Sequence, residues 1–261
     1  MQTMQTMQTD SPCALQVIDL HQRFGLSHIL CGLSFGVPQG MRLGIVGPNG
    51  AGKSTLFNLI SGRCRPNSGQ IWLNGCRIDG KTPRTIKQMG LSRSFQISHL
   101  FPNLSVFDHL RCAVLFGLGH SWGIRSLFCH PNDIGDRVHT LMARVQLDGQ
   151  RDTLAMHLCH ADQRALELAL TLASDAAVVL LDEPTAGMCT SESDRMVRLI
   201  RTVTAGKTLL IIEHDMDVVL GLADHIAVMV NGQLQAFDTA DAIRANTDVQ
   251  RSYGCLPLGP I

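Results

Sequence analysis

Three short apolar runs stand out along the chain, each bounded by turn or helix signals. Their composition suits strands in a sheet with helices on both sides, because such strands are apolar on both faces. Helical spacing of apolar residues appears at 56–60, 191–203 and 216–223. The runs themselves are Arg42–Val46, 177–181 and Thr208–Ile212. This alternation of strands and helices predicts an α/β fold with a parallel sheet at its core.

Strand patterns of a second kind flank this core. Apolar alternation at residues 15–18 leads to an expected turn, and residues 29–37 alternate until a Pro-Gln-Gly segment breaks the run. Residues 69–73 and 226–230 each run into an Asn-Gly pair, which a type I′ hairpin turn favours. We therefore predict a small antiparallel β subdomain beside the parallel core.

The period becomes helical between about residues 96 and 160, with an irregular stretch near 116–131, which predicts an α-helical subdomain inserted into the sheet domain. The repeat MQTMQTMQTD at the start predicts a polar, disordered tail, and Met4 or Met7 could also begin the protein. The expected organisation is a tail at 1–12 and one domain at 13–254, divided into 13–95 (β subdomain and first part of the core), 96–160 (helical subdomain) and 161–254 (rest of the core with a hairpin and helix).

Composition narrows the classes of function. Lysine plus arginine and aspartate plus glutamate both total 22 in 261 residues, so no excess positive charge is present to neutralise nucleic-acid phosphates. The nine cysteines form no Cys-x-x-Cys pair, which favours reduced thiols over disulfides or a zinc site. No run reaches the roughly 18 to 20 apolar residues of a membrane-spanning helix. We expect a cytoplasmic chain without nucleic-acid partners, which acts at a membrane only through other subunits.

Residues 47–55, GPNGAGKST, match the pattern G-x-x-x-x-G-K-[ST] between a predicted strand and a predicted helix. Glycines let successive main-chain N–H groups point inward, and with the helix N-terminus they form a binding site for phosphate. Lys53 is expected to bridge the β- and γ-phosphates, Ser54 to ligate Mg²⁺ and Thr55 to reach the α-phosphate. The predicted nucleotide-binding residues of the loop are Gly47, Pro48, Asn49, Gly50, Ala51, Gly52, Lys53, Ser54 and Thr55.

Two adjacent carboxylates end the apolar run at 177–181. Consecutive strand side chains diverge, so Asp182 is placed to face Mg²⁺ and Glu183 to act as a general base on the attacking water. His214 follows the run Thr208–Ile212 and reaches the same sheet edge, where an imidazole could hold the γ-phosphate and orient the water. Gln96, at the start of the helical segment, is a neutral candidate ligand for Mg²⁺ at the nucleotide. Lys53, Glu183 and His214 form the predicted catalytic set.

The order of these motifs resembles the ATP-binding cassette family, over nearly everything from residue 15 to about 253. This resemblance implies a phosphate-loop NTPase with a RecA-like parallel core, and it assigns to Phe24 the stacking on adenine. The segments 92–96, 100–106, 182–188 and 243–253 resemble the cassettes of branched-chain and hydrophobic amino acid importers and of urea importers. The implied assembly has two cassettes, separate permease subunits and an extracytoplasmic binding protein, with the cassettes at the cytoplasmic face of the inner membrane.

The chain departs from the family in the loop at residues 158–163, LCHADQ, where the family has a sequence near L-S-G-G-Q. In the family this loop caps the γ-phosphate held by the opposite subunit, which assigns Cys159 and Ala161 to the partner's nucleotide. A thiol is a weak donor, and a methyl group obstructs close approach of the backbone. The segment 188–190 also lacks the aspartate common in the family. We expect hydrolysis that is weakened and not abolished.

Several alternatives stay open at this point. One is a regulatory cassette that binds ATP with little turnover beside a more active partner, and another is a soluble cassette ATPase of translation or DNA repair. The cargo could be an amino acid, urea or another small amide, and the cassette pair could be a homodimer or a heterodimer. The apolar segment 100–106 could form core of the helical subdomain or dock a permease helix.

Overall fold

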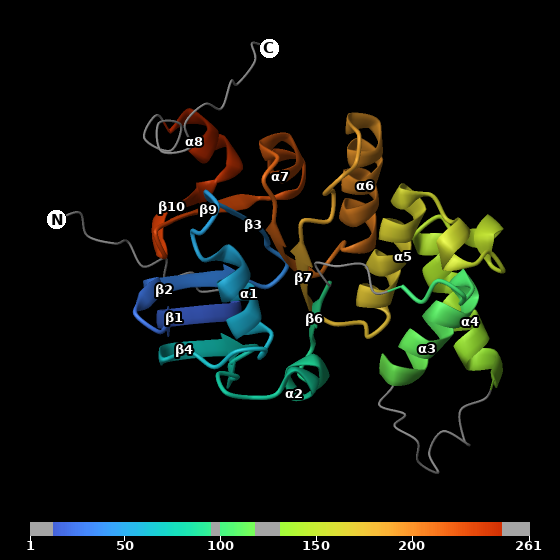
Figure 1. Ribbon diagram of the computed structural model, residues 1–261, viewed down its shortest axis with the longest axis horizontal. Helices are drawn as coiled ribbons and strands as arrows, with labels where there is room; N and C mark the ends of the chain where they lie inside the picture. The colour runs from blue at the N-terminus through green and yellow to red at the C-terminus, as the bar shows by residue number, and fades with distance from the viewer. Residues whose placement is uncertain (1–12, 95–99, 118–130, 247–261) are drawn as a thin grey trace.

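The computed structural model describes residues 13–94, 100–117 and 131–246, with side chains from residue 134 onward in the last range. Within these residues ten strands form two sheets, and eight α-helices surround them (Figure 1). The predicted tail at 1–12, Gln96 and the chain beyond residue 246 lie outside the described residues.

The larger sheet has six strands in the order β10-β9-β3-β8-β7-β6. Neighbouring strands are parallel except for β9 and β10, which are antiparallel. The three predicted apolar runs are β3, β8 and β7 at the centre of this sheet, which confirms the predicted parallel core. The strands are β3 Arg42–Val46, β6 Leu91–Arg93, β7 Val178–Asp182, β8 Thr208–Ile212, β9 His225–Val230 and β10 Gln233–Thr239.

The smaller sheet is antiparallel, in the order β2-β1-β4-β5. Its strands are β1 Cys13–Phe24, β2 Ser27–Pro38, β4 Ser68–Leu73 and β5 Cys76–Arg77. The turn between β4 and β5 has positive φ at both Asn74 (47°) and Gly75 (75°), and the turn between β9 and β10 has the same at Asn231 (49°) and Gly232 (74°). Two positive φ angles are what a type I′ turn requires, so both predicted hairpins are confirmed.

The prediction of a turn directly after residues 15–18 is wrong. β1 continues to Phe24, and the chain reverses at Gly25 and the next residue. The register with β2 shifts around Asp19, which has a φ of 45° and donates its N–H to Ser34 Oγ at 2.8 Å. Such a bulge interrupts the alternation of apolar residues within one strand, and in the sequence that interruption imitates a turn.

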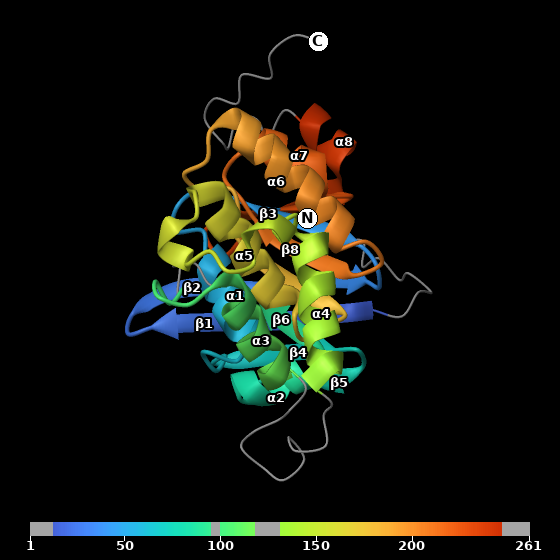
Figure 2. The same cartoon turned by 90° about the vertical axis from the view of Figure 1, so that its right-hand side faces the viewer.

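Helices α3, α4 and α5 lie between β6 and β7 in the chain, and they form a separate layer on the side away from the antiparallel sheet (Figures 1 and 2). In the part of the chain that the structure describes, no helix is long and apolar enough to cross a bilayer. The helices are α1 Lys53–Ile60, α2 Pro83–Gln88, α3 Val106–Gly117, α4 Pro131–Arg144, α5 His160–Leu172, α6 Thr190–Val203, α7 Met216–Leu222 and α8 Ala240–Ala245.

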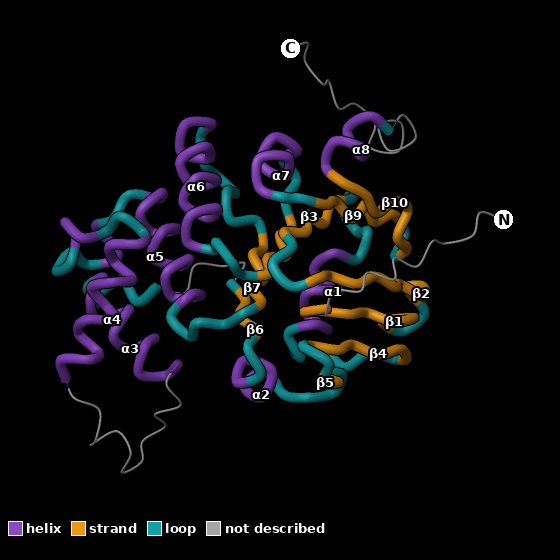
Figure 3. The backbone as a smooth tube through the Cα atoms, turned by 180° about the vertical axis from the view of Figure 1, so that it is seen from behind, coloured by secondary structure: helices purple, strands orange, loops and turns teal. Residues whose placement is uncertain are grey.

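Side chains of β7 alternate between two cores. Val178 and Leu180 pack with α1 and the antiparallel sheet, whereas Val179 and Leu181 pack with α5 and α6. The parallel sheet is therefore covered on both faces, as its continuous apolar strands predict. Because β3, β8 and β7 are parallel neighbours, their carboxyl ends meet at one edge of the sheet. Figure 3 shows the sheet from behind, with α7 above β3 and α1 below it.

Candidate functional site

The predicted phosphate loop connects β3 to α1. A Cβ on Gly47 would overlap the carbonyl oxygen of Met229 in β9, so only glycine fits at this point. Gly52 is the N-cap of α1 with a φ of 99°, a conformation that L side chains rarely adopt. The first hydrogen bond of the helix runs from Leu56 N to Gly52 O at 2.9 Å. The N–H groups of residues 53–55 therefore have no carbonyl partner inside the helix, and they are available to a phosphate.

Lys53 lies inside the loop that precedes it. Its Nζ donates to the carbonyl oxygens of Gly47 at 2.5 Å and Pro48 at 3.0 Å, and its side chain is buried. Burial lowers the pKa of Lys53, and the carboxylates of Glu183 and Asp182 oppose this effect. The hydrogen bonds of the lysine side chain are thus to main-chain carbonyl groups of its own loop, and the two carboxylates act on it through their charge.

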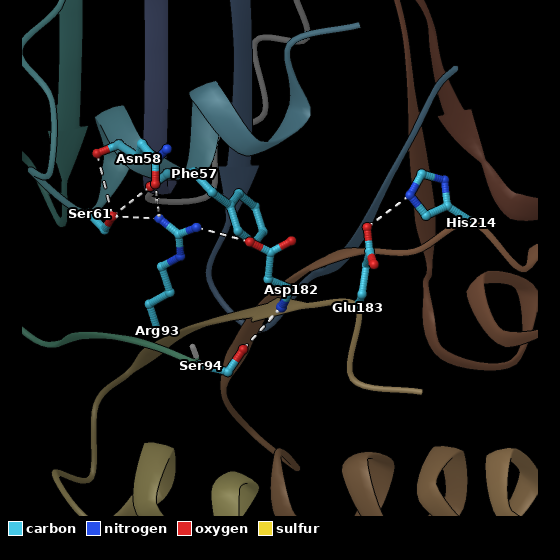
Figure 4. A network of polar contacts seen from close by, with 8 residues as sticks. All are labelled: Phe57, Asn58, Ser61, Arg93, Ser94, Asp182, Glu183 and His214. Atoms are coloured by element: carbon cyan, nitrogen blue, oxygen red, sulfur yellow. Dashed lines mark hydrogen bonds and ion pairs between the residues drawn. The ribbon is translucent and has the colours of Figure 1, made fainter. Parts of the chain in front are cut away.

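Asp182 ends β7 with its side chain buried (Figure 4). Its N–H donates to Ser94 Oγ at 3.0 Å, and its Oδ2 accepts from Arg93 at 2.9 Å. Its Oδ1 is buried without a hydrogen-bond partner among the described residues. A buried carboxylate oxygen without a partner raises the free energy of the folded state. A bound cation or a water molecule would supply the missing partner.

Arg93 is a residue of the site that the sequence did not identify. Its NH1 donates to Asn58 Oδ1 at 2.8 Å and to Ser61 Oγ at 2.9 Å, both in or at the end of α1, and its guanidinium lies 5.5 Å from the Phe57 ring centroid (Figure 4). Burial lowers the pKa of Arg93, and the ion pair with Asp182 opposes this effect. The sequence offered one signal for Arg93, because it lies in the segment 92–96 that resembles the importer cassettes. No role was assigned to the arginine within that segment.

Glu183 and His214 face each other at the edge of the sheet. His214 Nε2 lies 2.8 Å from Glu183 Oε1, and both side chains are partly exposed, 46% for the histidine and 28% for the glutamate (Figure 4). Glu183 has a φ of 49°, which is unusual for a residue with a side chain. The structure thus brings together the predicted general base and the predicted histidine at a face that water can reach.

Glu213 is the second residue that the sequence did not identify, although it stands beside His214. Its side chain is buried and accepts hydrogen bonds from Thr185 and from the His214 N–H. Burial raises the pKa of Glu213, and its hydrogen bonds to Thr185 partly offset this effect. Nothing in the sequence distinguishes it from a solvated residue after a strand, because its burial depends on the neighbouring loop.

The remaining predicted residues fall into three groups. Phe24 is 53% exposed at the end of β1. The next strand, β2, passes close to the phosphate loop, because a Cβ on Gly52 would contact Leu30 of β2. Gln96 lies outside the described residues. Cys159 is the exposed N-cap of α5, and Ala161 is buried in the first turn of that helix, which Figure 1 places across β6 and β7 from α1. The last two are therefore not part of the site formed around Lys53.

A strand, a glycine-rich loop ending in lysine, a helix and two carboxylates at the same sheet edge define a phosphate-loop nucleoside triphosphatase. Comparison with known proteins narrows this class. The family profile described as ABC transporter matches residues 30–186. The chain belongs to the ABC transporter family, as one of its ATP-binding, ATP-hydrolysing cassettes.

Individual relatives agree with this assignment. The chain is 32% identical over 249 residues to the high-affinity branched-chain amino acid transport ATP-binding protein LivG of Salmonella typhimurium, over 92% of this chain and 96% of that protein. BraF of Pseudomonas aeruginosa, a protein described in the same words, is 32% identical over 247 residues with the same coverage. A solved ATP-binding cassette of an ABC transporter in its ADP conformation matches with a TM-score of 0.81 and 26% identity, over 92% of this chain and 98% of that one. The predicted resemblance, fold and ATPase class are confirmed.

Proposed function

We propose that the chain uses ATP and Mg²⁺ to drive the import of branched-chain or other amino acids through separate permease subunits, at the cytoplasmic face of the inner membrane. The relatives support the choice of cargo, because LivG and BraF are high-affinity branched-chain amino acid transport ATP-binding proteins. The observation that carries the proposed mechanism of hydrolysis is the pairing of Glu183 with His214 at 2.8 Å, at the edge of the sheet where β7 and β8 end.

These side chains divide the chemistry of hydrolysis among them. Lys53 and the N–H groups at the start of α1 hold the phosphates and offset their charge. A water oxygen attacks the γ-phosphorus, the bond to the bridging β–γ oxygen breaks and ADP leaves. Glu183 accepts the proton of the attacking water, and His214, bonded to the same carboxylate, orients the base and contacts the γ-phosphate.

The donor set fits a Mg²⁺ ion. Asp182 offers a buried, unpartnered Oδ1 while Arg93 holds its Oδ2, and hydroxyl and carboxylate oxygens are the ligands that this hard cation prefers. Ser54 and Asp182 would hold the ion, with Gln96 as a further predicted ligand. When bound, Mg²⁺ neutralises charge that develops on the phosphate oxygens.

The complete hydrolytic site would need a second cassette. Cys159 and Ala161 lie at the N-terminus of α5, which β6 and β7 separate from α1. The exposed Cys159 is therefore placed to meet the nucleotide of a partner cassette across a dimer interface, whereas Ala161 is buried in the first turn of the helix. This placement also favours the second candidate function, a weakly hydrolysing cassette with a more active partner. The exposed Cys159 presents a thiol where the family presents a hydroxyl, and Ala161 adds a buried methyl group to the first turn of α5.

The permease subunits would dock beside the helical layer. A cavity of about 240 Å³ is lined by residues of α2, β6 and α5. Its apolar wall includes Ile86, Leu91 and Leu170, with Lys87 and Arg63 among its charged residues. Leu100 lines this cavity and also packs on the core of the helical layer. The segment 100–106 could therefore both form part of that core and dock a permease helix.

The test starts from the purified chain and ends with transport. We expect the chain to bind ATP in the presence of magnesium and Lys53→Ala to lose most of this affinity while remaining folded. In proteoliposomes with the permease subunits and binding protein, ATP should drive uptake of labelled leucine and not of labelled urea. Uptake of urea alone would refute the cargo, and a folded wild-type chain without affinity for ATP would refute the function as a whole.

A further inference from the structure

Glu213 occupies the space between the two loops that carry the predicted catalytic pair. It follows β8 directly and is 3% exposed. Its Oε1 accepts from Thr185 Oγ1 at 2.7 Å and from Thr185 N at 3.0 Å, and its Oε2 accepts from His214 N at 3.3 Å. One buried carboxylate thus joins the loop after β7 to the loop after β8.

The loop after β7 needs such a support. Glu183 has a φ of 49°, a left-handed conformation that is unfavourable for a residue with a Cβ and persists only where its surroundings enforce it. Three main-chain bonds hold the turn, from Glu183 N to Ile212 O at 2.9 Å, from Ala186 N to Glu183 O at 3.2 Å and from Met188 N to Thr185 O at 3.1 Å. The two bonds from Thr185 to Glu213 are the side-chain contribution to the same turn.

The chemistry of the contact argues for a role beyond packing. The groups that donate to Glu213 in the described part of the chain are two N–H groups and one hydroxyl, with no lysine or arginine among them. A carboxylate buried without a cation is expensive, and an apolar side chain would fill the space at lower cost. A group retained in spite of this cost is expected to position something.

We propose that Glu213 is a positioning residue for hydrolysis, which acts through Thr185 and the His214 main chain to keep Glu183 and His214 in contact. The proposal rests on the proposed function, since it assumes that these two residues act on the attacking water. Among the described residues, the Glu213 carboxylate bonds to Thr185 and the His214 main chain and not to the Glu183 carboxylate or the His214 ring, so its effect is on their geometry. The phosphate loop is not part of this arrangement.

Thr185 provides the most conservative test. Thr185→Val keeps the shape and the main-chain N–H but removes the shortest bond to Glu213, whereas Thr185→Ser keeps the hydroxyl. We expect Thr185→Val to lower kcat on the order of 10-fold and Glu213→Ala on the order of 100-fold, because a misplaced catalytic group costs rate steeply. Thr185→Ser should restore most of the rate. The KM for ATP and the affinity for ATP should stay unchanged in all three variants.

A buried threonine elsewhere controls for lost stability. Thr204 is fully buried at the end of α6, and its hydroxyl donates to Ile200 O at 2.7 Å. Thr204→Val removes one buried hydroxyl away from the site, so it should lower the melting temperature without lowering kcat. All variants are compared as full chains, with thermal unfolding recorded beside the steady-state rates. If Glu213→Ala does not fold, the pair Thr185→Val and Thr185→Ser still decides the question.

The outcomes separate this proposal from the proposed function. The proposal is overturned if folded Thr185→Val and Glu213→Ala keep the wild-type kcat, or if kcat falls equally in Thr185→Val and Thr204→Val. It is also overturned if Glu213→Ala lowers the residual rate of Glu183→Gln as much as it lowers the wild-type rate. A wild-type chain that does not hydrolyse ATP, alone or in its complex, sinks the proposed function instead.

Discussion

Removal of the Arg93 guanidinium should be among the most destabilising single changes outside the hydrophobic cores. The side chains of Arg93 and Asp182 are 8% and 0% exposed, and their charged atoms lie 2.9 Å apart. Arg93→Met keeps most of the apolar stem but leaves the Asp182 carboxylate buried without a partner. Breaking a buried pair in this way costs about 3 to 5 kcal/mol in the free energy of unfolding. At about 2 to 4 °C per kcal/mol for a chain of this size, the melting temperature should fall on the order of 10 °C.

The measurement is urea and thermal unfolding of the full chain in the absence of nucleotide. Arg77→Met is the matched control, because Arg77 also pairs with an aspartate, Asp79 at 2.8 Å, but its side chain is 52% exposed. We expect a smaller change in that variant, since the exposed guanidinium of Arg77 lets water screen the pair, although the Asp79 side chain is only 14% exposed. Asp182→Asn should recover much of the stability lost in Arg93→Met, because it removes the unpaired charge. A loss in Arg93→Met no larger than in Arg77→Met would show that the buried pair is not the source of stability.

Three further predictions follow from the site. Glu183→Gln should lower kcat by about 100-fold or more with ATP binding retained, since the general base is lost and the phosphate loop is intact; a rate near wild type in steady-state assays would contradict this role. Because burial raises the pKa of Glu213, the folded state binds more protons than the unfolded state between the ordinary and the raised pKa. The free energy of unfolding of wild type, relative to that of Glu213→Gln, should therefore decrease as pH rises from about 4.3. Urea unfolding at several pH values measures this difference, and an increase with pH would show that folding lowers the pKa of Glu213. Cys159→Ser combined with Ala161→Gly should raise hydrolysis by the assembled cassette pair, although glycine costs the helix about 1 kcal/mol, and an unchanged rate would show that this loop does not limit turnover.

The elements that the sequence predicted correctly depend on short-range physics. The strand Thr208–Ile212 agrees residue for residue, because a continuous apolar run of that length has few other places in a covered sheet. The two Asn-Gly turns were predictable because only a few residue types adopt two successive positive φ angles. The bulge at Asp19 was not, since it depends on the register against β2 and on Ser34, 15 residues further along the chain.

The candidate site divides along the same line. The phosphate loop is contiguous, so its residues and its conformation are specified together. Asp182 and Glu183 are adjacent and His214 is separate from them in sequence, but they lie at or just after the ends of the neighbouring strands β7 and β8. Parallel strands bring their carboxyl ends to one edge of the sheet. Strand order therefore sufficed to predict that they would meet.

The sequence by itself determined the class of the protein, the glycine-rich loop between β3 and α1, and the polar residues that follow β7 and β8. Only the tertiary structure decided that Arg93 holds the Asp182 carboxylate and that Glu213 joins the loops after β7 and β8. These contacts cross 89 and 28 residues of chain, respectively. Whether a charged side chain is buried, and which group satisfies it, depends on segments that come together in space, and residue type and spacing do not carry that information.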